Sequence, residues 1–150
     1  MRTAVDTNVI SALWSHEPLA SRMAGLLGRA YRAGGIMICA PVYAELLAHP
    51  GASERFVDEF LAATKVTVDF GLDETVWREA GRRFAAYAER RRKSGGSTAK
   101  RLLADFVVGA HAALRADRLL TLDAARYRRD FPELALMDVR ATGRGEAAEQ

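Results

Sequence analysis

The sequence predicts an α/β protein: a single domain whose central parallel sheet is flanked by helices on both faces. Short apolar stretches alternate along the chain with longer segments whose apolar residues recur every three or four positions. This alternation is typical of parallel sheets built from strand–helix–strand units. The length of 150 residues suits one domain, and a hydrophobic content of 49% is enough for one core.

The elements follow from apolar periodicity and from residues that begin or end helices. The predicted strands are residues 2–5, 36–40, 65–70, 118–122 and 134–137. The predicted helices are residues 9–14, 19–33, one that begins at Pro41, 53–63, one from Asp73 or Glu74 to Arg92, 100–116, and a short one before the last strand. Asp6 or Thr7 would cap the first helix, Gly34 and Gly35 would end the second, and His49-Pro50-Gly51 would end the third. Residues 93–99 read as a loop.

The predicted domain covers residues 1–140, and the polar residues 141–150 read as a flexible C-terminal tail. The N-terminus becomes polar too soon for a signal peptide, and no apolar run approaches the ~18 residues of a membrane span. We therefore expect a cytoplasmic protein with no membrane contact. Cys39 lies in an apolar run and is expected to be a buried, inert thiol.

The net charge of +3 permits a polyanionic partner without requiring one. Basic residues gather at two places, residues 90–101 and residues 126–129. Either group could be an ordinary solvated face or could contact phosphates. The candidates for contact with a nucleic-acid backbone are Arg92, Lys93, Lys100 and Arg126.

Four acidic residues occupy unusual positions. Asp6 directly follows the first predicted strand, and Asp123 directly follows the fourth. Glu45 lies one turn into the helix after the second strand, and Asp105 is the one charged residue between Leu102 and Ala110. Because sites in parallel sheets form beyond the carboxyl ends of the strands, all four can face the same end of the molecule.

Each acid also has an ordinary explanation, since Asp6 and Asp123 could cap helices, Glu45 could face solvent, and Asp105 could favour a helix N-terminus. Together, however, close carboxylates repel by about 4 kcal/mol per pair at ~4 Å and an effective dielectric near 20. Such a cluster retains protons or binds cations. Oxygen ligands suit Mg²⁺ or Mn²⁺. The three histidines lack ligand spacing, and His111 is expected to be packed or hydrogen-bonded.

The sequence around these acids resembles the PIN-domain family. The segments are Val5-Asp6-Thr7-Asn8-Val9, Ala44-Glu45-Leu46, Ala104-Asp105-Phe106-Val107-Val108-Gly109-Ala110 and Leu119-Leu120-Thr121-Leu122-Asp123. They are similar to the four acidic motifs of PIN domains in order and spacing, over residues 2 to about 138. The short single-domain form resembles the VapC-type ribonuclease toxins of VapBC toxin–antitoxin modules.

The resemblance implies that Asp6, Glu45, Asp105 and Asp123 are metal-binding catalytic acids, with Asn8 and Thr121 as supporting polar residues. Asp130 is a second acid after the fourth strand and could take the role given to Asp123, although we prefer Asp123. The implied activity is hydrolysis of RNA phosphodiesters with Mg²⁺ or Mn²⁺ as cofactor.

The resemblance further implies a VapB-type antitoxin as partner and a homodimer. Apolar residues of the early helices could make such contacts or could be ordinary core: Leu13, Trp14, Leu19 and Met23. Three rival functions stay open. They are a DNA-directed nuclease, a PIN-like module that binds RNA or protein without cleaving, and a phosphotransferase with an aspartyl nucleophile. The last commonly has a second Asp where this chain has Asn8.

Overall fold

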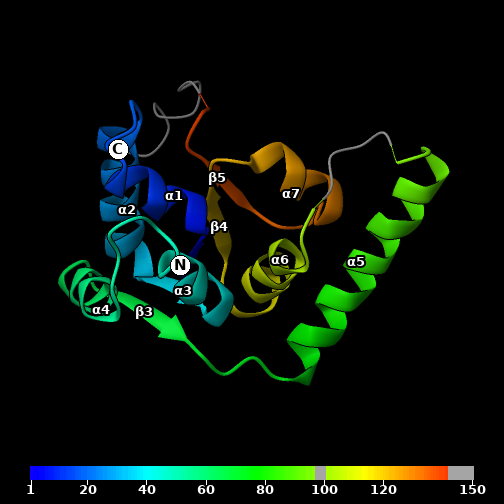
Figure 1. The fold of residues 1–150 in the computed structure, drawn as a ribbon, viewed down its shortest axis with the longest axis horizontal. Coiled ribbons are helices and arrows are strands. Elements are labelled where there is room, and N and C mark those ends of the chain that lie inside the picture. Colours follow the sequence, from blue (N-terminus) through cyan, green and yellow to red (C-terminus); the bar gives the residue numbers. More distant parts are fainter. Residues whose placement is uncertain (97–100, 142–150) are drawn as a thin grey trace.

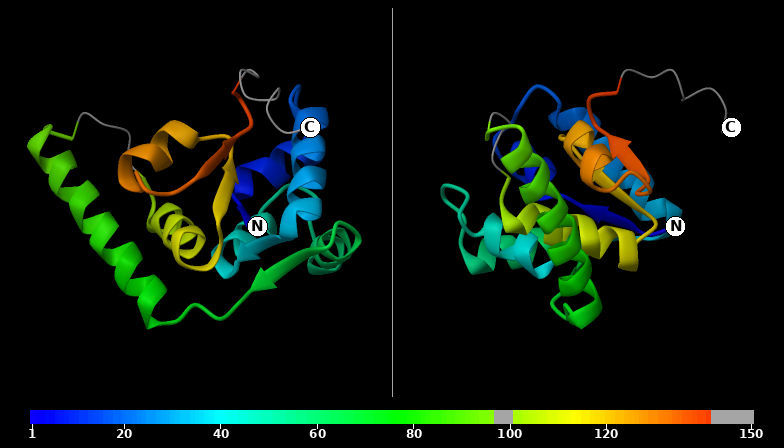
Figure 2. Two further views of the ribbon diagram at one scale, coloured as in Figure 1. Left: turned by 180° about the vertical axis from the view of Figure 1, so that it is seen from behind. Right: turned by 90° about the vertical axis from the view of Figure 1, so that its right-hand side faces the viewer.

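A computed structural model describes residues 1–96 and 101–141. Within them, five strands form one parallel sheet in the order β3-β2-β1-β4-β5. The strands are β1 (Thr3–Val5), β2 (Ile36–Cys39), β3 (Val66–Asp69), β4 (Arg118–Thr121) and β5 (Leu136–Asp138). Helices flank the sheet (Figures 1 and 2), so the predicted α/β architecture is confirmed.

The helices agree closely with the periodicity of the sequence. They are α1 (Thr7–Trp14), α2 (Ala20–Gly34), α3 (Ala40–Leu46), α4 (Glu54–Ala63), α5 (Glu74–Lys93), α6 (Leu103–Arg115) and α7 (Ala124–Asp130). Side chains cap three of them as expected from their residue types: Asp6 at α1, Ser53 at α4 and Asp73 at α5. Gly35, with φ of 109°, ends α2 in a conformation that favours glycine.

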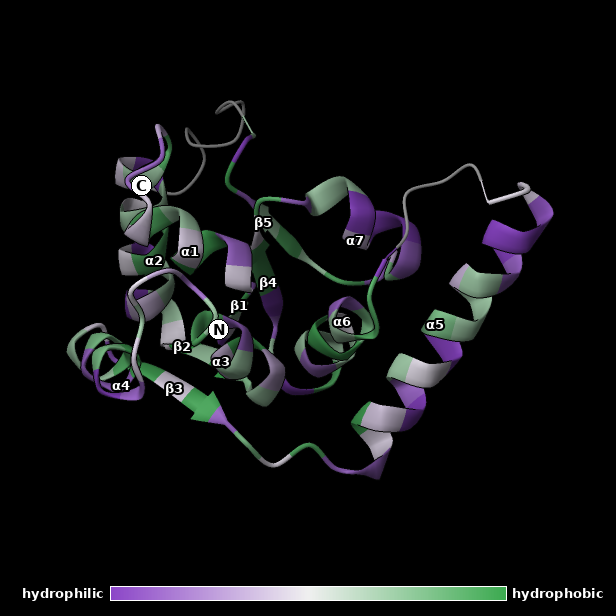
Figure 3. Ribbon diagram, viewed as in Figure 1, coloured by the Kyte–Doolittle hydropathy of each residue, from purple (hydrophilic) through white to green (hydrophobic). Residues whose placement is uncertain are grey.

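The core lies between the sheet and its helices. All residues of β1 and β2 are buried, as expected for central strands covered on both faces. Helix α2 packs on β1 and β2, α6 packs on β4, and the long α5 lies along α6 at one side of the molecule (Figures 1 and 3). Met23 is fully buried, and Leu13, Trp14 and Leu19 pack against the core, which favours the core interpretation of these residues.

Several predicted boundaries were wrong by one to three residues. Helix α6 begins at Leu103 rather than residue 100, because Asp105 closes its first turn by accepting the Leu102 N–H at 3.2 Å. Strand β4 ends at Thr121, so Leu122 separates Asp123 from the strand. Strand β5 covers Leu136–Asp138 rather than residues 134–137, and Lys93 belongs to α5 rather than to the loop. The remaining loop residues 97–99 and the tail residues 142–150 lie outside the described residues.

The connectivity creates a switch point beside β1. The chain leaves β1 toward β2 and β3 on one side, while β4 and β5 lie on the other side. The connections after β1 and β4 therefore diverge, and ligand sites of parallel sheets form where this happens. Asp6 and Asp123 follow these two strands.

Candidate active site

Asp6 is a buried carboxylate at the carboxyl end of β1, where only 8% of the residue is exposed. Its Oδ1 accepts the Thr7 backbone N–H at 2.8 Å, and its Oδ2 accepts the hydroxyls of Thr121 at 2.9 Å and Tyr127 at 3.0 Å. Burial raises the pKa of Asp6, the negative charge of Asp105 adds to that rise, and the two hydroxyls oppose it. Asp6 is therefore costly to ionise in the isolated protein.

Tyr127 is a site residue that the sequence analysis missed. It is buried on α7, the helix that follows β4, and its hydroxyl donates to Asp6 at the end of β1. Burial and the charges of Asp6 and Asp105 raise its pKa well above the ordinary value, so the phenol stays a donor. Its place four residues after Asp123 was the available signal, because i, i+4 residues share a helix face.

Asn8 and Thr121 link Asp123 to Asp6 through hydrogen bonds. The Asn8 amide donates to Asp123 Oδ2 at 3.2 Å, and its carbonyl oxygen accepts the Leu122 N–H at 3.3 Å. Thr121 Oγ1 accepts the Asp123 N–H at 3.0 Å while donating to Asp6. These bonds hold the ends of β1 and β4 together and place Asp123 beside Asp6.

Glu45 and Asp105 complete the acidic group from α3 and α6, two helices in contact. Glu45 is solvent-exposed, yet surrounding protein atoms and the charges of Asp6 and Asp105 raise its pKa. The Asp105 side chain is 33% exposed. The sequence leaves Asp105 at the solvent edge because it falls in the first turn of α6.

Three members of this acidic group, Asp6, Glu45 and Asp105, act on one another electrostatically. The negative charges of Asp6 and Asp105 both raise the pKa of Glu45, and that of Asp105 raises the pKa of Asp6. In residues 1–96 and 101–141, the side chains as placed form no group of three or more His, Cys, Asp or Glu that brackets one ion position. The predicted convergence of the four acids on one ion therefore stays a prediction.

The carboxylate oxygens of the acidic group nevertheless suit a hard divalent cation. Mutually repelling carboxylates are the ligands that Mg²⁺ and Mn²⁺ take, and a cation would offset the repulsion. The buried Thr7 hydroxyl, next to Asp6 in sequence, makes no hydrogen bond of normal geometry among the described residues, but it lies near enough to Glu45 to lower the pKa of that carboxyl. An unsatisfied polar atom at this position is available to a ligand or to ligand-bound water.

Comparison with known proteins identifies the family. The model of the PIN domain matches residues 3–132. The chain belongs to the PIN-domain family. No curated protein sequence matches this PIN domain at a significant level.

Solved structures share the fold across nearly the whole chain. VapBC-1 from nontypeable Haemophilus influenzae is 20% identical with a TM-score of 0.64, and 94% of this chain and 100% of that chain are covered. VapBC2 from Rickettsia felis, bound to a DNA fragment from its promoter, is 19% identical with a TM-score of 0.66, covering 92% and 98%. FitAcB from Neisseria gonorrhoeae is 19% identical with a TM-score of 0.58, covering 91% and 97%. At this identity the likeness establishes the fold.

Asp130 has a structural role in this PIN domain. Its side chain is 1% exposed and forms ion pairs with Arg90 and with the buried Arg101. The guanidinium of Arg101 also lies 5.0 Å from the ring centroid of Phe106 and 5.2 Å from that of Tyr127. Asp130 is therefore paired with arginines, whereas Asp123 accepts a hydrogen bond from the Asn8 amide.

The predicted basic residues divide between two places. Arg126 lies beside the acids, with its guanidinium 3.7 Å from Asp123. Arg92 and Lys93 lie at the far end of α5, where both pair with Glu89. Lys100 lies outside the described residues.

Two expectations about ordinary residues are confirmed. Cys39 is buried, and burial raises the pKa of its thiol to about 12. His111 is buried in α6 with its Nε2 3.1 Å from Asp69, and burial lowers its pKa.

In the described part of the chain, no helix has the length and apolar character to cross a membrane.

Proposed function

We propose that this PIN domain is a metal-dependent endoribonuclease and the toxin of a VapBC-type toxin–antitoxin module. The observation that supports the proposal most is the group of Asp6, Glu45 and Asp105 at the switch point, where the charge of Asp105 raises the pKa of Asp6 and the charges of Asp6 and Asp105 raise the pKa of Glu45. A protein without a cation to bind would gain stability by losing such a group. The PIN family match and the VapBC folds support the same activity.

In the proposed reaction Asp6, Glu45, Asp105 and Asp123 would hold one or two Mg²⁺ or Mn²⁺ ions, which supply Lewis-acid activation of water and neutralise charge on the phosphate. Tyr127 and Thr121 orient Asp6 by donating to the same oxygen, and Asn8 orients Asp123. Arg126 is placed to contact the RNA backbone beside Asp123. Water is the nucleophile, so no side chain forms a covalent intermediate.

The test is cleavage of single-stranded RNA by purified protein with Mg²⁺ or Mn²⁺. Asp6→Asn and Asp105→Asn should each lower the rate by at least about a hundredfold. Asp117→Asn is the matched control, because Asp117 is exposed at the opposite end of β4 and binds the Arg2 N–H. Full activity in a folded Asp6→Asn protein would reject the site, and equal cleavage of DNA of the same sequence would reject the RNA preference.

The module assignment adds a VapB-type antitoxin, a homodimer and a cytoplasmic location to the proposal. An apolar cavity of about 560 Å³ between α1, α2, α4 and the sheet, lined by Leu13, Trp14, Tyr31 and Phe60 among others, suits an apolar segment of a protein partner. We expect the chain to co-purify with a small protein encoded next to it. An isolated gene whose expression is harmless would contradict the toxin assignment.

A further inference from the structure

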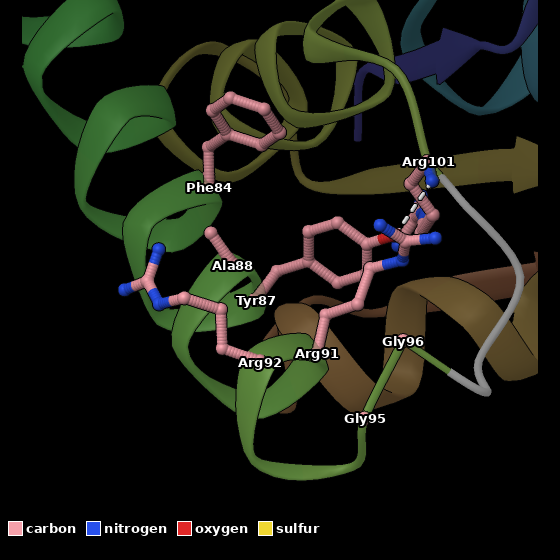
Figure 4. A pocket seen from close by; sticks show the side chains of 8 residues that line it. All are labelled: Phe84, Tyr87, Ala88, Arg91, Arg92, Gly95, Gly96 and Arg101. Atoms are coloured by element: carbon pink, nitrogen blue, oxygen red, sulfur yellow. Dashed lines mark hydrogen bonds between the residues drawn. The ribbon is translucent and has the colours of Figure 1, made fainter.

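A second pocket lies between the last turns of α5 and the start of α6, and its volume is about 400 Å³. Figure 4 shows Phe84, Tyr87, Ala88, Arg91 and Arg92 of α5 on one side and Arg101 on the other. Its volume lies within the range of small-molecule sites, roughly 300–1,000 Å³. Ala88, whose side chain is a single methyl group, also lines the pocket.

Tyr87 and Arg101 line this pocket, and Arg101 also contacts the acidic group. The backbone N–H of Arg101 donates to the Tyr87 hydroxyl at 2.7 Å. Its Nε lies 3.8 Å from Asp105 Oδ2, and its guanidinium stacks on the ring of Tyr127, which binds Asp6. The side chain of Arg101 therefore lines the pocket and lies beside Asp105, so the pocket is adjacent to one of the acids.

The lining combines aromatic surface with positive charge. The rings of Phe84 and Tyr87 are stacked with centroids 6.2 Å apart, and Phe84 is only half-buried. Arg92 is exposed and pairs with Glu89 at 2.7 Å. Exposed pairs of this kind are weak, so a phosphate can replace the carboxylate. Aromatic rings beside arginines are the features that hold single-stranded nucleic acid without sequence-specific contacts.

We propose that this arginine–aromatic pocket is a nucleotide subsite for single-stranded RNA, next to the cleavage site. A base enters the space beside Tyr87 and Phe84, and Arg91 and Arg92 at the rim contact the adjoining phosphates. The subsite rests on the proposed ribonuclease function, and it makes affinity depend on nucleotides beyond the scissile bond.

The proposal is tested by one variant that fills the pocket and one that removes a positive charge from its rim. Binding of a fluorescent eight-nucleotide single-stranded RNA is measured by anisotropy with Mg²⁺, in the Asp6→Asn background to prevent cleavage. Ala88→Trp should weaken binding at least about fivefold, because stacking on the pocket wall is lost. Its control is Ala86→Trp, which changes an exposed position of the same helix. Arg92→Ala should lower the slope of log affinity against log salt by about 0.7. Its control is Arg78→Ala, since Arg78 is also exposed on α5 and pairs with Glu74.

The outcomes separate the subsite from the nuclease. Loss of affinity in Ala88→Trp and Arg92→Ala but in neither control supports the subsite. If Ala88→Trp binds like its parent and, with Asp6 intact, cleaves RNA with unchanged KM, the subsite is refuted while the ribonuclease stands. If the protein with Asp6 intact cleaves no RNA and the Asp6→Asn form binds none, both proposals fall.

Discussion

Gly109 offers a test of how closely α6 and the segment after α7 are packed. A Cβ added at Gly109 would lie 2.3, 2.6 and 2.7 Å from three ring atoms of Phe131, far inside van der Waals contact. Phe131 is fully buried and packs against the rings of Phe106 and Tyr127, so its ring has no free space to enter. Gly109 lies one turn after Asp105, so this contact also sets how the acids of α6 and of the α7 segment face each other.

The magnitude follows from two opposing effects of Gly109→Ala. Alanine in a helix interior is favoured over glycine by about 1 kcal/mol. Overpacking a filled core costs about 1–3 kcal/mol, and more where a rigid ring must move. We expect a net loss of about 1–2 kcal/mol in the free energy of unfolding. For a domain of this size that lowers Tm by roughly 2–8 °C.

Thermal and urea unfolding followed by circular dichroism measures the effect. Gly81→Ala is the matched control, because Gly81 is an exposed position of α5 where an added Cβ meets nothing within 4 Å. This control should raise stability by about 1 kcal/mol through helix propensity alone. If Gly109→Ala were as stable as Gly81→Ala, the close contact with Phe131 and the reasoning built on it would be wrong.

Further predictions concern charge and the thiol. Because burial raises the folded-state pKa of Asp6, the stability from its protonated form is complete below about pH 4 and is lost as pH rises through the folded-state pKa. In urea unfolding without metal, the free energy of unfolding of Asp6→Asn should therefore rise relative to that of the unaltered protein as the pH is raised above about 4. A difference that does not change with pH would contradict this prediction. Saturating Mn²⁺, at ~100 times its Kd, should raise the stability of the unaltered protein by about 2.7 kcal/mol and that of Asp6→Asn far less, as a thermal shift would show. Asp130→Asn should lower the free energy of unfolding by about 3–5 kcal/mol, because it leaves Arg101 buried without its charged partner. Glu133→Gln, which changes an exposed ion pair, should lower it by less than about 1 kcal/mol. Equal losses for the two variants in denaturant unfolding would refute this contrast. Cys39 should react with a thiol reagent only after unfolding, since rapid labelling of the native protein would be inconsistent with a thiol of pKa about 12.

Most of the fold could be predicted from the chain because its signals are local. Apolar runs that end at Asp6 and Cys39, the capping residue Asp73 and the glycine pair after α2 each mark a boundary within a few residues. The errors fell where a tertiary or capping contact decided the end of an element. Helix α6 begins later than predicted because the Asp105 side chain accepts the Leu102 N–H at its first turn. Strand β4 ends earlier than predicted, at Thr121, whose hydroxyl donates to Asp6.

The sequence by itself determined the strand–helix order and placed Asp6 and Asp123 at the same end of the sheet, because the direction of parallel strands fixes where their carboxyl ends lie. Only the tertiary structure decided that Tyr127 supports Asp6 and that Asp130 is neutralised by Arg90 and Arg101. These contacts join residues 29–121 positions apart in the sequence, and no local pattern encodes such pairings. Burial then raises the pKa of Asp6 and of Tyr127, and burial exists only once the chain has folded.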